Sequence, residues 1–464
     1  MNFFIKCANI YHKRRGTMED TICAISTAPG IGAISIIRVS GPQALDIVSK
    51  IYRGKDLKKV QTHTINYGYI YNLEEKIDEV LVSVMLAPKT YTMEDIIEIN
   101  SHGGINTTNK ILELLLEYGC RLAEPGEFTK RAFLNGRIDL IEAESVNDLI
   151  NAKNDAARCL ALNNMSGILT KNIQNIRNII VGIMANIEVN IDYPEYEDIE
   201  IVTKENLIPK LLEVKNKIEM ILKDSRNGKI IKEGINVAIV GKPNVGKSSL
   251  LNALLDEEKA IVTNVAGTTR DIVEGHITID GFLINFIDTA GIRETEDIVE
   301  KIGVEKSKKV IDSSDIVILV LNNNEEITEY EKELMNKIPK NKRIVYVNKS
   351  DLENKLLIKE EYLIGNTINL EGLNNLKNAI IRKLNLENIL SKDMTYMSNI
   401  RQLDLLKKSL KNINNAISNL EAGMPIDIAE IDITNAWNLL GEITGETYQD
   451  ELINTLFSNF CLGK

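Results

Sequence analysis

The sequence predicts an α/β multidomain protein: an N-terminal α/β domain precedes a helical domain, into which a second α/β domain with a phosphate-binding loop is inserted. Three observations predict this organisation. The chain of 464 residues is too long for one hydrophobic core. The apolar periodicity changes from mixed to helical, then to alternating strand and helix, and back to helical. A glycine-containing run, Gly241 to Ser248, follows a short apolar strand.

Composition narrows the class of protein. The chain is 44% hydrophobic and 26% charged and has no unbroken apolar run of the roughly 18 residues that a spanning helix needs, so we expect a cytoplasmic protein without a membrane span. The net charge of -11 argues against a basic coat for unspecific nucleic-acid binding, although a local patch at Lys130, Arg131 and Arg137 stays open. Five widely separated cysteines predict neither a zinc site nor disulfides.

The N-terminal α/β domain is expected over residues 18–137. Residues 1–17 are interpreted either as a disordered arm or as the product of a start codon assigned too early, since Met18 stands directly before a strand-like run. Strands are predicted at Ala33 to Val39 and Glu79 to Leu86, and a helix at Thr107 to Tyr118.

The helical domain is expected in two parts, residues 138–229 and 389–464, around the inserted domain at 230–388. Between Glu142 and Asp224 apolar residues recur every three or four positions with almost no turn signals, which indicates long helices. Pro194 predicts a helix break. Joints between the parts are predicted near Asn227-Gly228 and from Asn385 to Lys392.

The run from Gly241 to Ser248 has the context that a phosphate loop requires. It lies between a predicted strand, Val237 to Val240, and a helix from Ser249. Glycines let backbone N–H groups approach the phosphates, Lys247 supplies a charge for the β and γ oxygens, and the Ser248 hydroxyl is a magnesium ligand.

Two further segments complete a phosphate-sensing site. Asp288 to Gly291 ends the predicted strand Leu283 to Ile287, where the carboxylate holds magnesium through water and the glycine N–H senses the γ-phosphate. Thr269, in the run 267–271, is expected to complete the magnesium shell when the γ-phosphate is present. That run is therefore the predicted switch.

The base-reading segment is Asn348 to Asp351, after an apolar strand. The Asp351 carboxylate accepts two donors that guanine has and adenine lacks, so the inserted domain is predicted to be a Ras-like GTPase domain. The later loop has Asn366-Thr367 where that pattern has Ser-Ala, a departure expected to loosen guanine affinity. The predicted GTP-binding set is Asn244, Val245, Gly246, Lys247, Ser248, Ser249, Thr263, Asn264, Val265, Ala266, Gly267, Thr268, Thr269, Asp288, Thr289, Ala290, Gly291, Asn348, Lys349 and Asp351.

The group that positions the attacking water is not evident from these motifs, because Ile292 stands where Ras-type switches carry a glutamine. The downstream acids Glu294, Glu296, Asp297 and Glu300 are candidates. For all but one of them we favour a solvated loop or a helix cap.

With these residues, the chain resembles the MnmE (TrmE) family of tRNA-modification GTPases from Met18 onward. Beyond the GTPase motifs, the resemblance lies in five segments: Ala28 to Gly32 with Arg38, Glu94 to Glu98 followed by His102 to Gly104, Pro125 to Phe128, Arg131 to Arg137, and Phe460 to Lys464. It implies a homodimer that works on tRNA with the flavoprotein MnmG (GidA), which supplies FAD and NADH. The implied product is a carboxymethylaminomethyl-type group on the wobble uridine.

The resemblance also implies site residues. Arg38, Glu98, Arg137 and Lys464 would bind a tetrahydrofolate one-carbon donor, 5,10-methylenetetrahydrofolate, of which 5-formyltetrahydrofolate is an analogue. Potassium would be held by Asn244, Thr263, Val265 and Thr268, and Glu300 would orient the water, which makes the implied catalytic set Glu300, Lys247 and Thr269. Three interpretations of Cys461 stay open: a catalytic thiol, a wall of the folate pocket, or a buried apolar anchor, which is the commonest role of a lone cysteine.

The competing function is a ribosome-assembly switch GTPase of the Era or Der kind, which would share every GTPase motif. The sequence disfavours this function, because it has no Gly-x-x-Gly RNA-binding pattern after the GTPase region, no second phosphate loop, and an aromatic content of only 5%.

Overall fold

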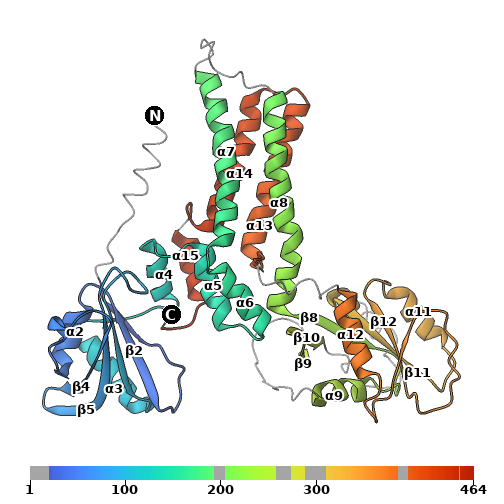
Figure 1. Cartoon of the computed structure of the whole chain (residues 1–464), viewed down its shortest axis with the longest axis horizontal. Helices are drawn as coiled ribbons and strands as arrows, with labels where there is room; N and C mark the ends of the chain where they lie inside the picture. Colours follow the sequence, from blue (N-terminus) through green and yellow to red (C-terminus); the bar gives the residue numbers. More distant parts are fainter. Residues whose placement is uncertain are drawn as a thin grey trace. The chain divides into compact units, whose positions relative to one another are not determined.

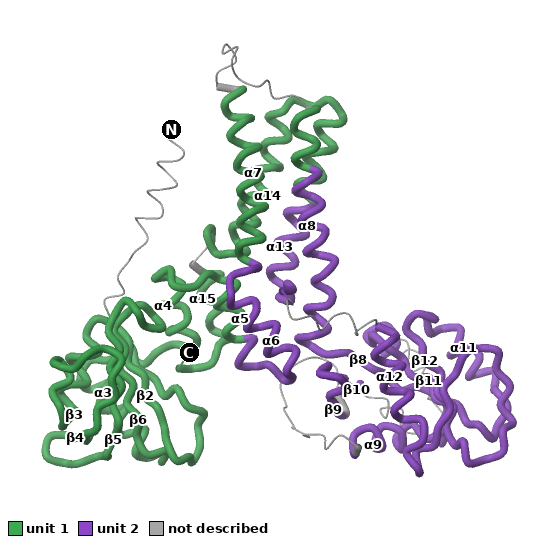
Figure 2. The backbone as a smooth tube through the Cα atoms, viewed as in Figure 1, with its two compact units in different colours: residues 1–147, 170–211, 411–464 green, residues 148–169, 212–410 purple. Residues whose placement is uncertain are grey.

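The computed structural model describes residues 20–192, 204–257, 273–287, 310–384, 395–448 and 450–463, and Figure 1 shows its elements along the chain. Two compact units can be distinguished, coloured separately in Figure 2. The first holds the described parts of 1–147, 170–211 and 411–464, and the second those of 148–169 and 212–410.

The first unit contains a seven-stranded sheet in the order β3-β4-β5-β6-β2-β1-β7, antiparallel except where β7 pairs with β1. Its strands are β1 (Ile22–Ile25), β2 (Ile34–Ser40), β3 (Tyr52–Gly54), β4 (Thr64–Asn72), β5 (Glu75–Met85), β6 (Ile96–His102) and β7 (Arg121–Leu122). Helices α2 (Ala44–Ile51) and α3 (Ile105–Glu117) bury their apolar faces against one side of the sheet, and η1 (Leu57–Lys59) lies at its edge. The predicted N-terminal α/β domain is confirmed.

The predicted helices are also present, but the chain turns more often than expected. The helices are α4 (Glu127–Leu134), α5 (Leu140–Ile150), α6 (Asp155–Asn164), α7 (Ile168–Asp192), α8 (Lys204–Glu233), α13 (Ile400–Glu421), α14 (Ile426–Thr444) and α15 (Asp450–Ser458). Asn154 caps α6 by accepting a bond from the Ala157 N–H at 2.7 Å, and Gly167 adopts a φ of 76° before α7. These turns interrupt a stretch in which almost no turn was expected.

One predicted joint is wrong. Helix α8 continues through Asn227-Gly228 to Glu233, and the chain leaves it only at Gly234, where φ is 85°. A Cβ added at Gly228 would come within 2.8 Å of the Tyr396 Cβ. The glycine therefore allows Tyr396 to pack closely against helix α8. The second predicted joint and Pro194 lie outside the described residues.

The inserted domain is a six-stranded sheet in the order β13-β12-β11-β8-β10-β9, in which only β9 is antiparallel. The strands are β8 (Ile235–Val240), β9 (Val273–Ile279), β10 (Phe282–Ile287), β11 (Ile316–Asn322), β12 (Arg343–Asn348) and β13 (Leu363–Ile364), and the helices are α9 (Lys247–Glu257), α11 (Glu329–Lys337) and α12 (Leu373–Lys383). Two apolar clusters cover opposite faces of the sheet. Ligand sites are expected at the carboxyl ends of such parallel strands.

None of the described helices is both long enough and apolar enough to cross a bilayer.

Candidate functional site

The phosphate loop connects the end of β8 to the start of α9. Gly241 and Gly246 have φ values of 154° and 99°, so both adopt backbone conformations that side chains disfavour. At Gly246 an added Cβ would also collide with the Asn348 amide. Helix α9 begins at Lys247, so its N-terminal N–H groups face the same loop.

Side chains fasten the base-reading loop to the phosphate loop. The Asn348 amide donates to the Val245 carbonyl at 3.0 Å, and the Lys349 ammonium donates to the Asn244 carbonyl at 3.2 Å. Lys247 donates to the carbonyls of Gly241 at 3.0 Å and Lys242 at 2.9 Å. The predicted phosphate-binding and base-reading residues are therefore neighbours in space.

These loops line a single cavity of about 520 Å³. One wall holds Asn244, Gly246, Lys247, Ser248 and Ser249, and the other holds Asn348, Lys349, Asp351, Leu352, Asn366, Thr367 and Ile368. Sequence reasoning missed the part that Asn366 plays: its amide donates to Asp351 Oδ1 at 2.8 Å. The asparagine itself could have indicated this role, because its amide group can donate and accept hydrogen bonds at the same time.

The rest of the predicted set falls in parts of the chain that the structure does not describe. Thr263, Asn264, Val265, Ala266, Gly267, Thr268, Thr269, Asp288, Thr289, Ala290, Gly291, Glu300 and Lys464 lie outside the described residues. The described residues contain no group of three or more His, Cys, Asp or Glu side chains that could hold a metal ion.

In the first unit, two of the four predicted folate residues, Arg38 and Arg137, lie over the Tyr91 ring, and a third, Glu98, is bonded to Arg38. Arg38 and Glu98 are paired opposite each other on β2 and β6, and Arg38 Nε donates to Glu98 Oε1 at 2.8 Å. The Arg38 guanidinium lies 5.8 Å from the centre of the Tyr91 ring, and that of Arg137 lies 4.8 Å from it. The Gly463 carbonyl accepts a bond from Arg38 at 3.4 Å, so the chain terminus reaches the same place.

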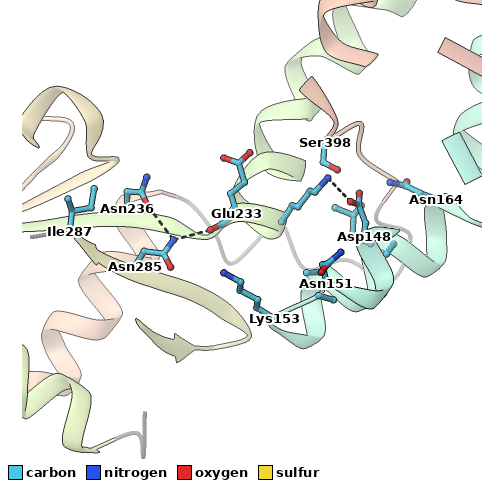
Figure 3. A pocket seen from close by; sticks show the side chains of 14 residues that line it. Asp148, Asn151, Lys153, Asn164, Glu233, Asn236, Asn285, Ile287 and Ser398 are labelled. Carbon is cyan, nitrogen blue, oxygen red and sulfur yellow. Dashed lines mark hydrogen bonds and ion pairs between the residues drawn. The ribbon is translucent and has the colours of Figure 1, made fainter. Parts of the chain in front are cut away.

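A second cavity, of about 460 Å³, lies in the second unit and is shown in Figure 3. Its polar lining is largely bonded to itself: Lys232 pairs with Asp148 at 2.7 Å, and the Asn285 amide donates to the Glu233 carbonyl at 2.9 Å. We interpret these contacts as packing between α8, α5 and the sheet.

Comparison with known proteins places the chain in a family. Residues 140–461 match the model of the MnmE helical domain, and residues 21–137 match that of the GTP-binding protein TrmE N-terminus. A "tRNA modification GTPase MnmE" from Ligilactobacillus salivarius is 53% identical over 460 residues, covering 97% of this chain and 99% of the relative. One from Enterococcus faecalis is 52% identical with the same coverage.

The chain belongs to the MnmE (TrmE) family of tRNA-modification GTPases. The resemblance drawn from the motifs is thus confirmed, as is the assignment of a GTPase. Among solved structures, the G domain of the T. maritima FeoB iron transporter matches with 30% identity, 32% coverage of this chain, 98% of that chain and a TM-score of 0.26.

Several residues in the segments that carry the family resemblance form a salt-bridge network that holds these segments together. The Arg131 guanidinium is fully buried and bonds to Asp20 at 2.8 Å, to Glu127 at 3.1 Å and to Glu94 at 3.2 Å. Burial alone would raise the pKa of Glu127, but the bonds from Arg121, the Glu124 N–H and Arg131 outweigh burial and lower that pKa. This network ties the Glu94 and Pro125 segments together.

The structure excludes one interpretation of Cys461. The thiol is exposed, so it is not a buried apolar anchor, and the Cys461 carbonyl accepts a bond from the Gly126 N–H at 3.2 Å. The terminal segment is held by its backbone, which leaves the cysteine side chain free to face a ligand.

Proposed function

We propose that this protein hydrolyses GTP and, with the flavoprotein MnmG, places a carboxymethylaminomethyl-type group on the wobble uridine of certain tRNAs, using a tetrahydrofolate one-carbon donor. The observation that carries the nucleotide half is the single cavity that joins the phosphate loop to the Asp351 carboxylate. Membership of the MnmE family supports the tRNA half.

In the nucleotide cavity each residue type suits its assigned role. Lys247 would move from the loop carbonyls to the β and γ oxygens, and Asp351 would accept the two guanine donors. Ser248, at the start of α9, suits a magnesium ligand, with Thr269 as the second proposed ligand. Magnesium would neutralise charge that develops on the phosphates.

In the N-terminal site the ion pair refines the proposed roles. Because Arg38 lies 2.8 Å from Glu98, we assign both side chains to the same part of a folate. Glu98 suits the donors of the pterin ring, with Arg38 holding its carboxylate in place. Arg137 and Lys464 are then the groups left for the glutamate carboxylates of the donor.

An exposed apolar strip supports the homodimer. The sheet face not covered by α2 and α3 carries Ile65, Tyr67 and Leu81 on the neighbouring strands β4 and β5, with 46 to 69% of each residue exposed. Apolar side chains gathered on one face of a sheet are typical of a protein interface. A second copy of this chain is the proposed partner.

Mass spectrometry of wobble nucleosides from a strain lacking this protein tests the proposal. Wild type should restore the modified uridine, whereas Lys247→Ala and Glu98→Gln should not. Glu353→Gln is the matched control, because this carboxylate is 80% exposed and lies on the surface of the GTPase domain. Unmodified tRNA in the wild-type strain, or full restoration by both variants, would overturn the proposal.

A further inference from the structure

The Asn366 side chain is almost fully buried, with 3% exposed, in the wall of the guanine cavity. Its two amide atoms have different partners: Nδ2 donates to Asp351 Oδ1 at 2.8 Å, and Oδ1 accepts from the Ile368 N–H at 2.8 Å. If the amide were flipped, its oxygen would face the Asp351 carboxylate and its NH₂ group would face the Ile368 N–H. These two partners therefore determine the orientation of the amide.

The backbone around Asn366 is also held in place. The Asn366 N–H donates to the Glu371 carbonyl at 3.0 Å, and the Ser350 N–H donates to the Gly365 carbonyl at 3.1 Å. Gly365 in turn donates to the Val347 carbonyl at 3.0 Å. The loop that carries Asn366 is therefore pinned to the strand end and loop that carry Asp351, so the amide meets the carboxylate from a set direction.

Such a partner prepares a carboxylate to read guanine. The terminal torsion of an aspartate is broad and roughly two-fold, whereas guanine presents N1–H and the 2-amino group side by side in one plane. Both carboxylate oxygens must lie in that plane for two bonds to form. A donor on one oxygen restricts the rotation and leaves the other lone pairs available.

We propose that Asn366 is a positioning residue that sets the plane of the Asp351 carboxylate and thereby determines the preference for guanine over hypoxanthine. This inference rests on the proposed nucleotide site. It replaces the expectation that Asn366-Thr367 loosens guanine affinity. The asparagine uses separate atoms for two tasks: Nδ2 donates to Asp351, and Oδ1 accepts from the Ile368 N–H and so closes the turn. A hydroxyl would have to do both with a single oxygen.

Competition binding of GDP and IDP to the full-length protein tests the inference. IDP lacks the 2-amino group, so the ratio of its affinity to that of GDP measures the second bond to Asp351. Asn366→Ala should weaken GDP about tenfold, the loss expected for one charge-assisted hydrogen bond, and should weaken IDP less. The preference for GDP then falls.

Asn366→Asp isolates the donor. Its oxygen still accepts the Ile368 N–H, so the turn is kept, but it turns a second carboxylate toward Asp351 and should weaken GDP more than Asn366→Ala does. Asn374→Ala is the control, an exposed asparagine on α12 that should leave both affinities unchanged. Circular dichroism verifies that the variants fold.

Equal losses for GDP and IDP in both variants would show that Asn366 only supports the loop, and would overturn the inference. Failure of the underlying site gives a different result: wild type would show no preference for GDP over IDP or ADP. A wild-type preference that survives in Asn366→Ala rejects the inference while leaving the nucleotide site standing.

Discussion

The nucleotide cavity and the proposed folate site around Arg38 and Glu98, here called the Arg38 site, are assembled in different ways. The cavity uses loops at the ends of parallel strands, and within its phosphate loop Lys247 donates to carbonyls five and six positions away in the chain, although the bonds that join this loop to the base-reading loop span 103 and 105 positions. The Arg38 site uses side chains on the faces of antiparallel strands, and its bonds join residues 60 and 425 positions apart. The phosphate loop depends on local sequence, whereas a site on a sheet face depends on strand register.

The two sites also differ in how charge is compensated. Arg38 and Glu98 neutralise each other with only 18% and 21% of their side chains exposed, and Arg131 in the same unit is surrounded by carboxylates. Lys247 donates to two neutral carbonyls of its own loop, which an anionic phosphate displaces readily. We therefore expect a single substitution in the cavity to change ligand selectivity. A single substitution in the Arg38 site should instead change the shape of that site.

The largest expected effect concerns base selectivity. Asp351→Asn should shift nucleotide preference from GTP toward xanthosine triphosphate by about 10⁴-fold, because the new amide donates to the carbonyl that replaces the guanine amino group. Competition binding of the two nucleotides to wild type and variant measures the shift. Unchanged preference would mean that Asp351 does not read the base.

An intermediate effect is expected at the sheet-face site. Removal of residues 461–464 should weaken folate binding about tenfold, since it takes away Lys464 and the Gly463 carbonyl that accepts from Arg38. GTP affinity should not change. Titration with 5-formyltetrahydrofolate and with a GTP analogue measures both, and equal folate affinity in the truncated protein would remove the terminus from the site.

The difference in assembly explains what the sequence could predict. The strand, loop and helix around Lys247 were predicted closely, because a phosphate loop is one continuous segment. The Arg38–Glu98 pair depends on how β2 aligns with β6, which no local pattern encodes, so only the family resemblance indicated those residues. At Asn366 the sequence indicates only a departure from the Ser-Ala pattern, because its partner Asp351 lies in another loop.

The smallest expected effect is the dependence of hydrolysis on potassium. The transition state needs positive charge, and no arginine is clearly placed by the sequence to supply it. Among the described residues the Asn244 side chain has no hydrogen-bond partner, although it lines the cavity at a φ of 61°, so its amide oxygen is available as a neutral hard ligand. We expect GTP hydrolysis to be severalfold faster in potassium than in sodium at equal ionic strength.

Two variants resolve the proposed roles in hydrolysis. Asn244→Ala should abolish the difference between the two salts, because it removes a ligand of the cation. Glu300→Ala should lower the hydrolysis rate with little change in GTP affinity, as expected for a group that orients water, and Glu296→Ala is the matched control that should hydrolyse GTP like wild type. If Glu300 were only an acid near the start of a helix, its loss would cost about 0.3 to 1 kcal/mol of local stability and leave the rate unchanged. Equal rates in both salts, or a Glu300→Ala protein as fast as wild type, would contradict this mechanism while leaving the assignment of the guanine cavity intact.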